Sequence, residues 1–315
     1  MSNSFARISV IIPTLNGGTV FRQLLAQLSC QSIAVDELLV VDSNSDDETC
    51  VVAEEFGATV IPISRDAFDH GATRSMVARQ AHGEVLIFFT QDAVPVDRDL
   101  IKNLIEPLQQ PSIALSYGRQ LPGPDASLSA TALRHFNYPD ISSIREFSDK
   151  EQLGLKTAFV SNSCAAYRRS SLKEVNYFPD NLIFGEDTCT AGRLLQKGYK
   201  IAYVAEATVL HSHNYSLVQE FRRSFDIGVL HAIEHWLPET YGRAEGEGLR
   251  YVKYELARIL QQNKWYLLPQ FFCRNLMKFI GYKLGSKYGI LPQWLAQRLS
   301  MNGNWWRRVA DEAKL

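Results

Sequence analysis

The sequence lacks the features of a disulfide-rich, zinc-binding or membrane-spanning protein. Its 5 cysteines are scattered through 315 residues, with no CxxC pair and no zinc-like spacing, which favours a reduced, cytosolic setting. No uncharged apolar run approaches the ~20 residues that a membrane-spanning helix needs. The N-terminus has no apolar core followed by a small-residue cleavage site, so we expect no signal peptide. The composition is globular, with room for one large domain and an appendage, or for two domains.

The chain also lacks an even distribution of charge, although its net charge is only −1. From Leu249 onward there are 12 Lys/Arg and 3 Asp/Glu, whereas residues 1–248 carry 21 Lys/Arg and 31 Asp/Glu. A basic tail on an acidic body suggests an anionic partner for the tail, such as a phospholipid surface or nucleic acid. A solvated helical face is the alternative.

The first ninety residues alternate strand and helix patterns. Short apolar runs rich in β-branched residues predict strands at 8–13, 37–42, 58–63 and 84–90. The predicted helices between them are 20–30, 46–57 and 72–82. This alternation predicts an α/β fold with a mostly parallel central sheet and helices on both faces. Such sheets bind ligands at the carboxyl ends of their strands.

The remaining residues are less regular. We expect 111–156, with four prolines, to be a long loop-rich segment, and 157–169 to hold a strand and the start of a helix. A helix is predicted over 187–198, and 199–213 contains two short strand-like runs split around Ala205–Glu206. From about Leu217 the chain is predicted to be mostly helical.

Polar residues end each of the four predicted strands, where core packing does not require them. Asp92 follows the fourth strand and suits a hard divalent cation such as Mg²⁺ or Mn²⁺, although an aspartate that starts a turn is the common alternative. Asp42 follows the second strand and is free to accept hydrogen bonds from a ligand, unless it caps the next helix. Arg74 precedes Asp92 by one helix-plus-strand unit, so it returns to the same sheet edge, where it suits a base carbonyl or a diphosphate. A surface arginine is the alternative.

The connector FDHGATRS, residues 68–75, concentrates polar chemistry before a predicted helix. Gly71 allows close backbone approach to a ligand. We expect Asp69 and His70 to meet that ligand or to fix the loop.

Two further pairs carry chemistry. Glu186 and Asp187 precede a predicted helix, where they are either caps or a general base with its neighbour. His211 and His213 lie two residues apart at a strand end, so they face the same side and could complete a metal site with Asp92. A dedicated zinc site would need further ligands that the sequence lacks.

In this order, these segments resemble glycosyltransferase family 2, a family of inverting enzymes with the GT-A fold. The resemblance runs from about Ile8 to about Gly228. It rests on SVIIPTLNGG, LLVVDSNSDDET, the spacing from Arg74 to Gly83, FFTQDAVP in the place of the D-x-D motif, SNSCAAYRRS, and GED followed by LLQKGYKIAYV and a histidine. Within the family, FDHGATR, TQDAVP, YGRQLP and HSHNYS look most like bacterial rhamnosyltransferases of cell-surface polysaccharide assembly.

The resemblance implies a role for each candidate on the donor side. Pro13, Thr14 and Asp42 would hold the nucleotide base, and Arg74 would also face the nucleotide. Asp69 and His70 would meet the donor sugar or fix the loop.

On the reaction side, the resemblance implies that Asp187 is the general base and that Glu186 helps to bind the acceptor. Asp92 would hold Mg²⁺ or Mn²⁺ on the donor diphosphate. His211 would reach the metal or the diphosphate, with His213 as the second choice.

One position departs from the family pattern, because Thr90 replaces the first acid of D-x-D. A single carboxylate leaves the metal loosely held or dispensable. The implied reaction starts from a nucleotide diphosphate sugar and inverts the anomeric configuration in one step. The expected donor is dTDP-β-L-rhamnose, which gives an α-L-rhamnoside, and a UDP- or GDP-linked sugar is the alternative.

Two rival functions follow from other readings of the same residues. A nucleotidyltransferase shares nucleotide binding on an α/β sheet, but NGG at 16–18 lacks the basic signature that attacks phosphate. A non-catalytic nucleotide-sugar-binding protein fits the incomplete D-x-D motif, although the presence of Asp92, Asp187 and Arg74 together argues against it.

The tail predicts basic amphipathic helices. Phe272, Leu276, Phe279 and Ile280 share helical spacing, and Arg274 and Lys278, repeated by Lys283 and Lys287, lie on another side. Further anchors are Trp265, Trp294, Trp305 and Trp306. Such helices can lie in the interface of an anionic membrane. Helices packed on the catalytic domain, or a dimer contact, are the alternatives.

We therefore expect a GT-A catalytic domain over 1–240, with a nucleotide-sugar half (1–110) and an acceptor half (111–240), and a basic helical region over 241–315. The acceptor would be a glycan carried on a lipid diphosphate. The protein would lie on the cytoplasmic face of the bacterial inner membrane, with no nucleic-acid partner.

Overall fold

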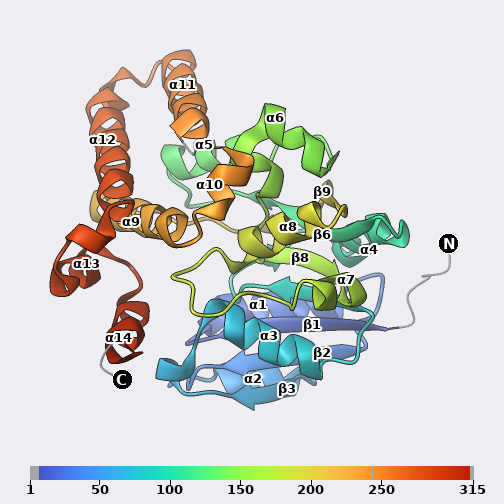
Figure 1. Ribbon diagram of the computed structural model, residues 1–315. Coiled ribbons are helices and arrows are strands. Elements are labelled where there is room, and N and C mark those ends of the chain that lie inside the picture. Colours follow the sequence, from blue (N-terminus) through green and yellow to red (C-terminus); the bar gives the residue numbers. More distant parts are fainter. Residues whose placement is uncertain (1–6, 243–244, 313–315) are drawn as a thin grey trace.

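The computed structural model describes residues 7–242 and 245–312, and a single mixed sheet is formed by strands between Ile8 and Leu210 (Figure 1). In the described residues the strand order is β3-β2-β1-β4-β8-β6-β9-β5, and β7 pairs with β9. The strands are β1 (Ile8–Thr14), β2 (Glu37–Asp42), β3 (Thr59–Pro62), β4 (Val85–Phe89), β5 (Val94–Pro95), β6 (Ile113–Leu121), β7 (Ser143–Arg145), β8 (Cys164–Arg168) and β9 (Lys200–Leu210).

The first four strands are parallel, as the alternating pattern predicts. Beyond β4 the sheet is mixed, because β8 runs antiparallel to both β4 and β6. The helices of this half are α1 (Gly18–Ser29), α2 (Thr49–Glu55), α3 (His70–Gln80), α4 (Leu100–Ile105), α5 (Leu128–Asn137), α6 (Lys150–Leu153), α7 (Arg169–Glu174) and α8 (Glu186–Gln196).

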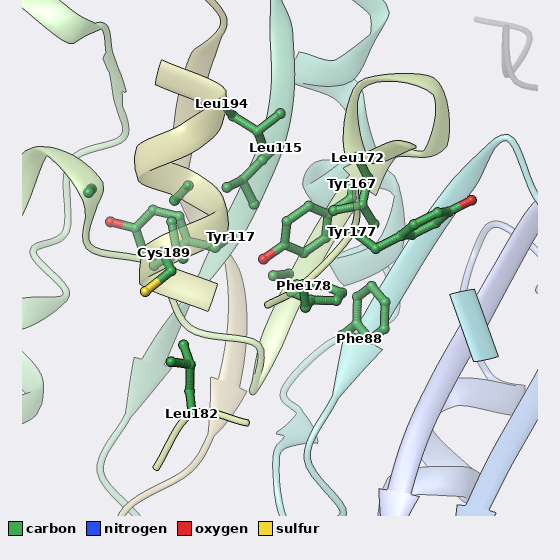
Figure 2. Close-up of a cluster of buried hydrophobic side chains, with 14 of the residues drawn as sticks. Phe88, Leu115, Tyr117, Tyr167, Leu172, Tyr177, Phe178, Leu182, Cys189 and Leu194 are labelled. Atoms are coloured by element: carbon green, nitrogen blue, oxygen red, sulfur yellow. The ribbon is translucent and has the colours of Figure 1, made fainter. Parts of the chain in front are cut away.

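Two hydrophobic cores lie on the two faces of the sheet, because successive side chains of a strand point to opposite faces. In β4, Val85, Ile87 and Phe89 pack with α1 and α4, whereas Leu86 and Phe88 pack with α3 and α8. Figure 2 shows the second core, where the rings of Phe88, Tyr167 and Phe178 meet edge to face with centroids 5.1–5.5 Å apart. This core packs beneath the loops that carry the candidate site residues.

The expectation of a loop-rich segment over 111–156 is wrong. This segment contains β6, α5, β7 and α6, and β6 lies inside the sheet between β8 and β9. Its prolines fall outside β6, in the connections, so they interrupt no hydrogen-bond ladder. The two strand-like runs expected over 199–213 form one strand, β9, whose pairing with β6 jumps from Gly118↔Val204 to Arg119↔Thr208. The predicted split at Ala205–Glu206 therefore marks a bulge.

The C-terminal residues are helical, as expected, and lie along one side of the sheet (Figure 1). The helices are α9 (Leu217–Ile233), α10 (Trp236–Tyr241), α11 (Glu245–Gln261), α12 (Leu268–Gly285), α13 (Gln293–Leu299) and α14 (Gly303–Glu312). Helices α9 and α12 touch backbone to backbone, since a Cβ added at Gly285 would lie 1.9 Å from the carbonyl oxygen of Phe225. In the described part of the chain, no helix is long and apolar enough to cross a bilayer.

Two expectations about the tail need correction. Arg274 and Lys278 do not lie on an outer basic face, because both pair with Glu220 of α9, at 2.8 and 3.5 Å. Trp305 and Trp306 are not surface anchors, because both are buried. The apolar stripe of α12 does face outward, with Phe272, Leu276 and Phe279 each more than half exposed. Trp265 and Trp294 are also exposed.

Candidate active site

The carboxyl ends of β1 and β2 bring the three expected base-binding residues together. Thr14 pairs with Asp42 in the parallel register, and Pro13 precedes it. The Thr14 hydroxyl donates to Asp42 Oδ1 at 3.0 Å, and the backbone N–H of Ser45 donates to Oδ2 at 2.8 Å. Burial alone would raise the pKa of Asp42, but hydrogen bonds from Ser45 and Thr14 outweigh it and lower the pKa. Asp42 is therefore a fixed, ionised acceptor.

The connector 68–75 forms the N-terminus of α3, and its polar residues contact other parts of the chain. Asp69 is the N-cap of α3, and its Oδ1 accepts from the N–H groups of Gly71 and Ala72 at 3.0 and 2.8 Å. Its Oδ2 pairs with Arg308 of α14 at 2.7 Å. A Cβ added at Gly71 would lie 1.7 Å from the carbonyl oxygen of Pro179. The close approach that Gly71 permits is therefore to the chain's own backbone.

Arg74 points to the acid pair. Its Nη1 lies 3.2 Å from Glu186 Oε1, and both side chains are buried. The same nitrogen donates to the backbone carbonyl of His70 at 3.0 Å and lies 3.3 Å from His70 Nδ1. Burial would raise the pKa of Glu186, but the charges of Arg74 and His70 hold it below its ordinary value. Glu186 is therefore an ionised acceptor at neutral pH.

Asp187 lies in the first turn of α8 and is half-buried. Its Oδ2 accepts from the backbone N–H of Asn162 at 3.2 Å, and its Oδ1 accepts from the N–H of Thr188 at 2.7 Å. Burial and the charge of Glu186 raise the pKa of Asp187 to about 7. A carboxylate with a pKa near the working pH is well matched to proton abstraction.

The turn before α8 explains how two neighbouring acids face the site. Gly185 has φ of 82°, a left-handed conformation that glycine adopts without strain, and it forms the N-cap of α8 without a side-chain bond. Neither acid is therefore the N-cap of α8, although Asp187 still accepts from the first-turn N–H of Thr188. A Cβ at Gly185 would also lie 2.6 Å from Leu230 Cδ2 of α9.

Asn162 organises the acid pair, and the sequence did not single it out. Its Nδ2 donates to Glu186 at 3.2 Å, while its backbone N–H binds Asp187. Its Oδ1 accepts from the hydroxyl of Tyr167 at 2.7 Å. All of these groups are joined in one network, and Asn162 is buried. Asn162 lies in SNSCAAYRRS, a segment that carries the family resemblance but to which no role was assigned.

The second group of polar side chains is a candidate metal site. Asp92 Oδ1 lies 3.4 Å from His211 Nε2, and Asp92 Oδ2 lies 3.8 Å from His213 Nε2. One ligand atom of each residue lies within 4.8 Å of the others. The pairing of β5 with the end of β9 produces this meeting, because Val94 is opposite Leu210. Both histidines, rather than one, therefore reach Asp92.

The chemistry of these three side chains fits a divalent cation. Burial would raise the pKa of Asp92, but the hydrogen bond and charge of His211 lower it, so the carboxylate is ionised. Burial and the neighbouring His211 lower the pKa of His213 to about 4, which leaves it neutral and able to bind a metal at neutral pH.

Gln120 is a second residue that the sequence analysis did not assign. Its Oε1 lies 2.9 Å from His211 Nδ1, so Nδ1–H can donate to it and leave Nε2 free for a metal. The Gln120 amide donates to Ser161 at 2.9 Å, next to Asn162 of the acid-pair network. The segment 161–163 thus lies between the metal candidate and the acid pair.

Residues 9–175 match the domain described as glycosyl transferase family 2. The chain belongs to glycosyltransferase family 2. It is a glycosyltransferase, and the GT-A fold that the sequence predicts is confirmed. It is 42% identical to the O-antigen chain rhamnosyltransferase RfbN of Salmonella typhimurium, over 96% of this chain and 97% of that protein. It is 38% identical to the O-antigen chain rhamnosyltransferase WbaN of Salmonella anatum, over 96% of each.

The solved structures similar to this glycosyltransferase support the fold alone. A mannosyltransferase from Pyrobaculum calidifontis, solved with GDP-Man and Mn²⁺, has a TM-score of 0.65 at 16% identity and covers 90% of this chain and 88% of its own. TarS of S. aureus, solved with UDP-GlcNAc, has a TM-score of 0.52 at 15% identity, with 89% and 90% coverage.

Proposed function

We propose that this glycosyltransferase moves L-rhamnose from dTDP-β-L-rhamnose to a hydroxyl of a glycan acceptor in O-antigen-like polysaccharide synthesis. The observation that carries the reaction is Asp187, a carboxyl with a pKa near 7 held beside an ionised Glu186. The rhamnose assignment is supported by the two Salmonella relatives, which match this chain over nearly its full length.

In the proposed reaction, Asp187 takes the proton of the acceptor hydroxyl. The hydroxyl oxygen forms a bond to the anomeric carbon as the bond from that carbon to the donor diphosphate breaks on the opposite face. The nucleotide diphosphate leaves with the bonding electron pair, so the β-linked donor gives an α-L-rhamnoside. Glu186, kept ionised by Arg74, binds a second acceptor hydroxyl. Alignment of the two reactants supplies much of the rate.

A divalent cation held by Asp92, His211 and His213 would neutralise the charge that develops on the departing diphosphate. Two imidazoles and one carboxylate form a mixed nitrogen and oxygen set, whereas Mg²⁺ prefers oxygen ligands. We therefore propose Mn²⁺ ahead of Mg²⁺. The positive charges of Arg134 and Arg223 both act on His213 and would add to the attraction for the diphosphate.

The donor would lie along the sheet edge between these groups. Pro13, Thr14 and Asp42 would contact the base, and Asp42 would accept from its ring N–H. His70 would face the sugar. Because the guanidinium of Arg74 is paired with Glu186, its main role would be to hold the acid pair. A contact with the nucleotide would be secondary.

We also propose that the outer face of α12 lies on an anionic membrane, where a lipid-diphosphate-linked acceptor would be found. Exposed Phe272, Leu276 and Phe279 form a continuous apolar stripe. The sequence from Leu249 to Val309 contains a single acid, Glu255, and that acid is buried. The exposed charge beside the stripe is therefore positive, which favours anionic lipid. In this proposal the protein would lie peripherally on the cytoplasmic face of the inner membrane.

The division into a catalytic unit (1–240) and a basic helical region (241–315) is part of the same proposal. Residues 243–244 at the junction, and residues 1–6 and 313–315, lie outside the described residues. The 1–110 half would bind the nucleotide sugar, and the 111–240 half would bind the acceptor.

The deciding experiment is transfer from a panel of nucleotide sugars, with and without Mn²⁺. We expect dTDP-β-L-rhamnose to be consumed and to protect the protein against heating more than UDP- or GDP-linked sugars do. Asp187→Asn should retain that protection and lose transfer. Protection with equal transfer by Asp187→Asn would remove the base assignment. Nucleotide release that depends on pyrophosphate would indicate a nucleotidyltransferase instead.

Membrane binding has its own test. Phe272→Ser/Phe279→Ser should lose flotation with vesicles containing phosphatidylglycerol and keep transfer to a soluble acceptor. Phe271→Leu, a buried neighbour on the opposite side of α12, is the matched control. Wild-type protein that stays unbound at moderate salt would exclude the membrane surface.

A further inference from the structure

We infer that α14 is a strap that holds the two loops of the active site in place, with Arg308 as its positioning residue. This inference rests on the proposed function of Glu186 and Asp187, because the strap acts through the loops that carry them and Arg74. The tail would then have a role in the reaction that is separate from membrane attachment.

The first contact of the strap is with the connector before α3. Arg308 Nη1 donates to the carbonyl oxygen of Phe68 at 3.0 Å, and Nη2 pairs with Asp69 Oδ2 at 2.7 Å. One planar guanidinium thus binds a backbone group and a side chain of consecutive residues, across 239 positions of sequence. Asp69 is buried, so its charge needs this partner.

The contact continues from Asp69 to the acid pair. The other oxygen of Asp69 caps α3, whose first two turns carry His70 and Arg74. Arg74 in turn holds Glu186, which neighbours Asp187. Loss of the Arg308 charge would leave Asp69 free to turn away from the cap, and the N-terminus of α3 would loosen. The arginine that sets the charge of the acid pair would then lose its fixed position.

The second contact is with the loop that leads to the acid pair. Trp305 Nε1 donates to the carbonyl oxygen of Asn181 at 2.9 Å. The base of the strap is fastened to α9, where Asp226 Oδ2 accepts from the N–H of Met301 at 2.9 Å. The ring of Trp306 lies against Phe225 of α9. From this anchored base, α14 reaches both loops at once.

The test compares Arg308→Ala with Arg307→Ala. Arg307 is the matched control because it is exposed, and its hydrogen bond within the described residues stays inside α14, to Asn304. We expect Arg308→Ala to lower kcat/KM for the donor about tenfold, measured well below both melting temperatures, and Arg307→Ala to leave it within twofold. Arg308→Lys keeps a cation for Asp69 and should recover more than half of the loss. If Arg308→Ala does not fold, Arg308→Gln keeps the length and removes the charge.

If Arg308 only stabilises the fold, the expected results differ. Arg308→Ala would then lower the melting temperature, leave kcat/KM at low temperature within twofold of the control, and show no recovery by lysine. That result would overturn the inference. The strap can be tested even if the proposed donor is wrong, because backbone amide exchange is measured without any donor. In Arg308→Ala, faster exchange confined to residues 69–75 and 178–188 supports the strap, and unchanged exchange there refutes it.

Discussion

Replacing Asp187 with asparagine should raise the free energy of unfolding relative to the wild type, and this advantage should be larger at pH 8 than at pH 5. Burial and Glu186 raise the pKa of this carboxyl from its ordinary 3.8 to about 7 in the folded state. As pH rises from about 4 to about 7, the unfolded chain loses a proton that the folded protein keeps. The unfolded state then binds fewer protons, so the wild-type free energy of unfolding falls through this window and is constant above it.

The magnitude follows from the same interval. A pKa raised from 3.8 to about 7 lowers stability by about 4 kcal/mol at most at pH 8, and by less than half of that at pH 5. Asparagine does not ionise, and its single Oδ1 keeps one of the two bonds that Asp187 accepts from the N–H groups of Asn162 and Thr188. The loss of the other bond does not depend on pH. The advantage of Asp187→Asn should therefore grow by about 2–3 kcal/mol between pH 5 and pH 8.

Urea unfolding of both proteins at several pH values measures this difference. Asp180→Asn is the matched control, because Asp180 is an exposed carboxylate of the same loop. The reasoning fails if the difference between Asp187→Asn and wild type does not change with pH. It also fails if Asp180→Asn shows the same increase, because burial beside Glu186 would then not be the cause.

Three further predictions concern neighbouring groups. Glu186→Gln removes a negative charge that raises the pKa of Asp187, so the acid limb of the pH–rate profile should move down by about one pH unit; an unmoved limb would contradict the pairing. Gln120→Ala removes the acceptor that orients a metal-binding imidazole and should weaken Mn²⁺ binding about 10–100-fold by calorimetry, whereas unchanged affinity would argue against this site. Gly71→Ala places a methyl group against a backbone carbonyl and should destabilise the protein by about 1–3 kcal/mol, while Gly246→Ala, with open space around it, should be neutral in the same denaturation assay.

The N-terminal half of the fold was predictable because its signals are local. Buried parallel strands are short continuous apolar runs, and all four predicted strands are present within a few residues of their expected ends. The polar ends of these strands also meet as expected, since Thr14 and Asp42 are paired in register. The segment 111–156 was misjudged because β6 contains Ser116, Gly118 and Arg119, and a strand inside a sheet does not need a purely apolar sequence.

Contacts between distant segments were not predictable from one sequence. The pairing of Arg74 with Glu186 joins two helix starts more than a hundred residues apart. Asn162 and Gln120 act through hydrogen bonds whose geometry only the folded chain supplies. In the tail, helical spacing gave the outward stripe of α12 correctly. It could not tell that Arg274 and Lys278 find an acid on α9, because periodicity describes one helix and not its neighbour.

The backbone contact between α9 and α12 has a consequence for the choice of acceptor. Gly228, Gly281 and Gly285 leave no room between these helices for a side chain, so the two pack backbone to backbone. Leu230 of α9 packs against Gly185 beside the acid pair, so α9 connects the outer stripe to Asp187 through direct contacts. If that stripe rests on the bilayer, the reacting hydroxyl must come to one fixed height above the lipid. The enzyme would then select acceptors by length, because only a glycan whose reacting hydroxyl reaches that height could be used.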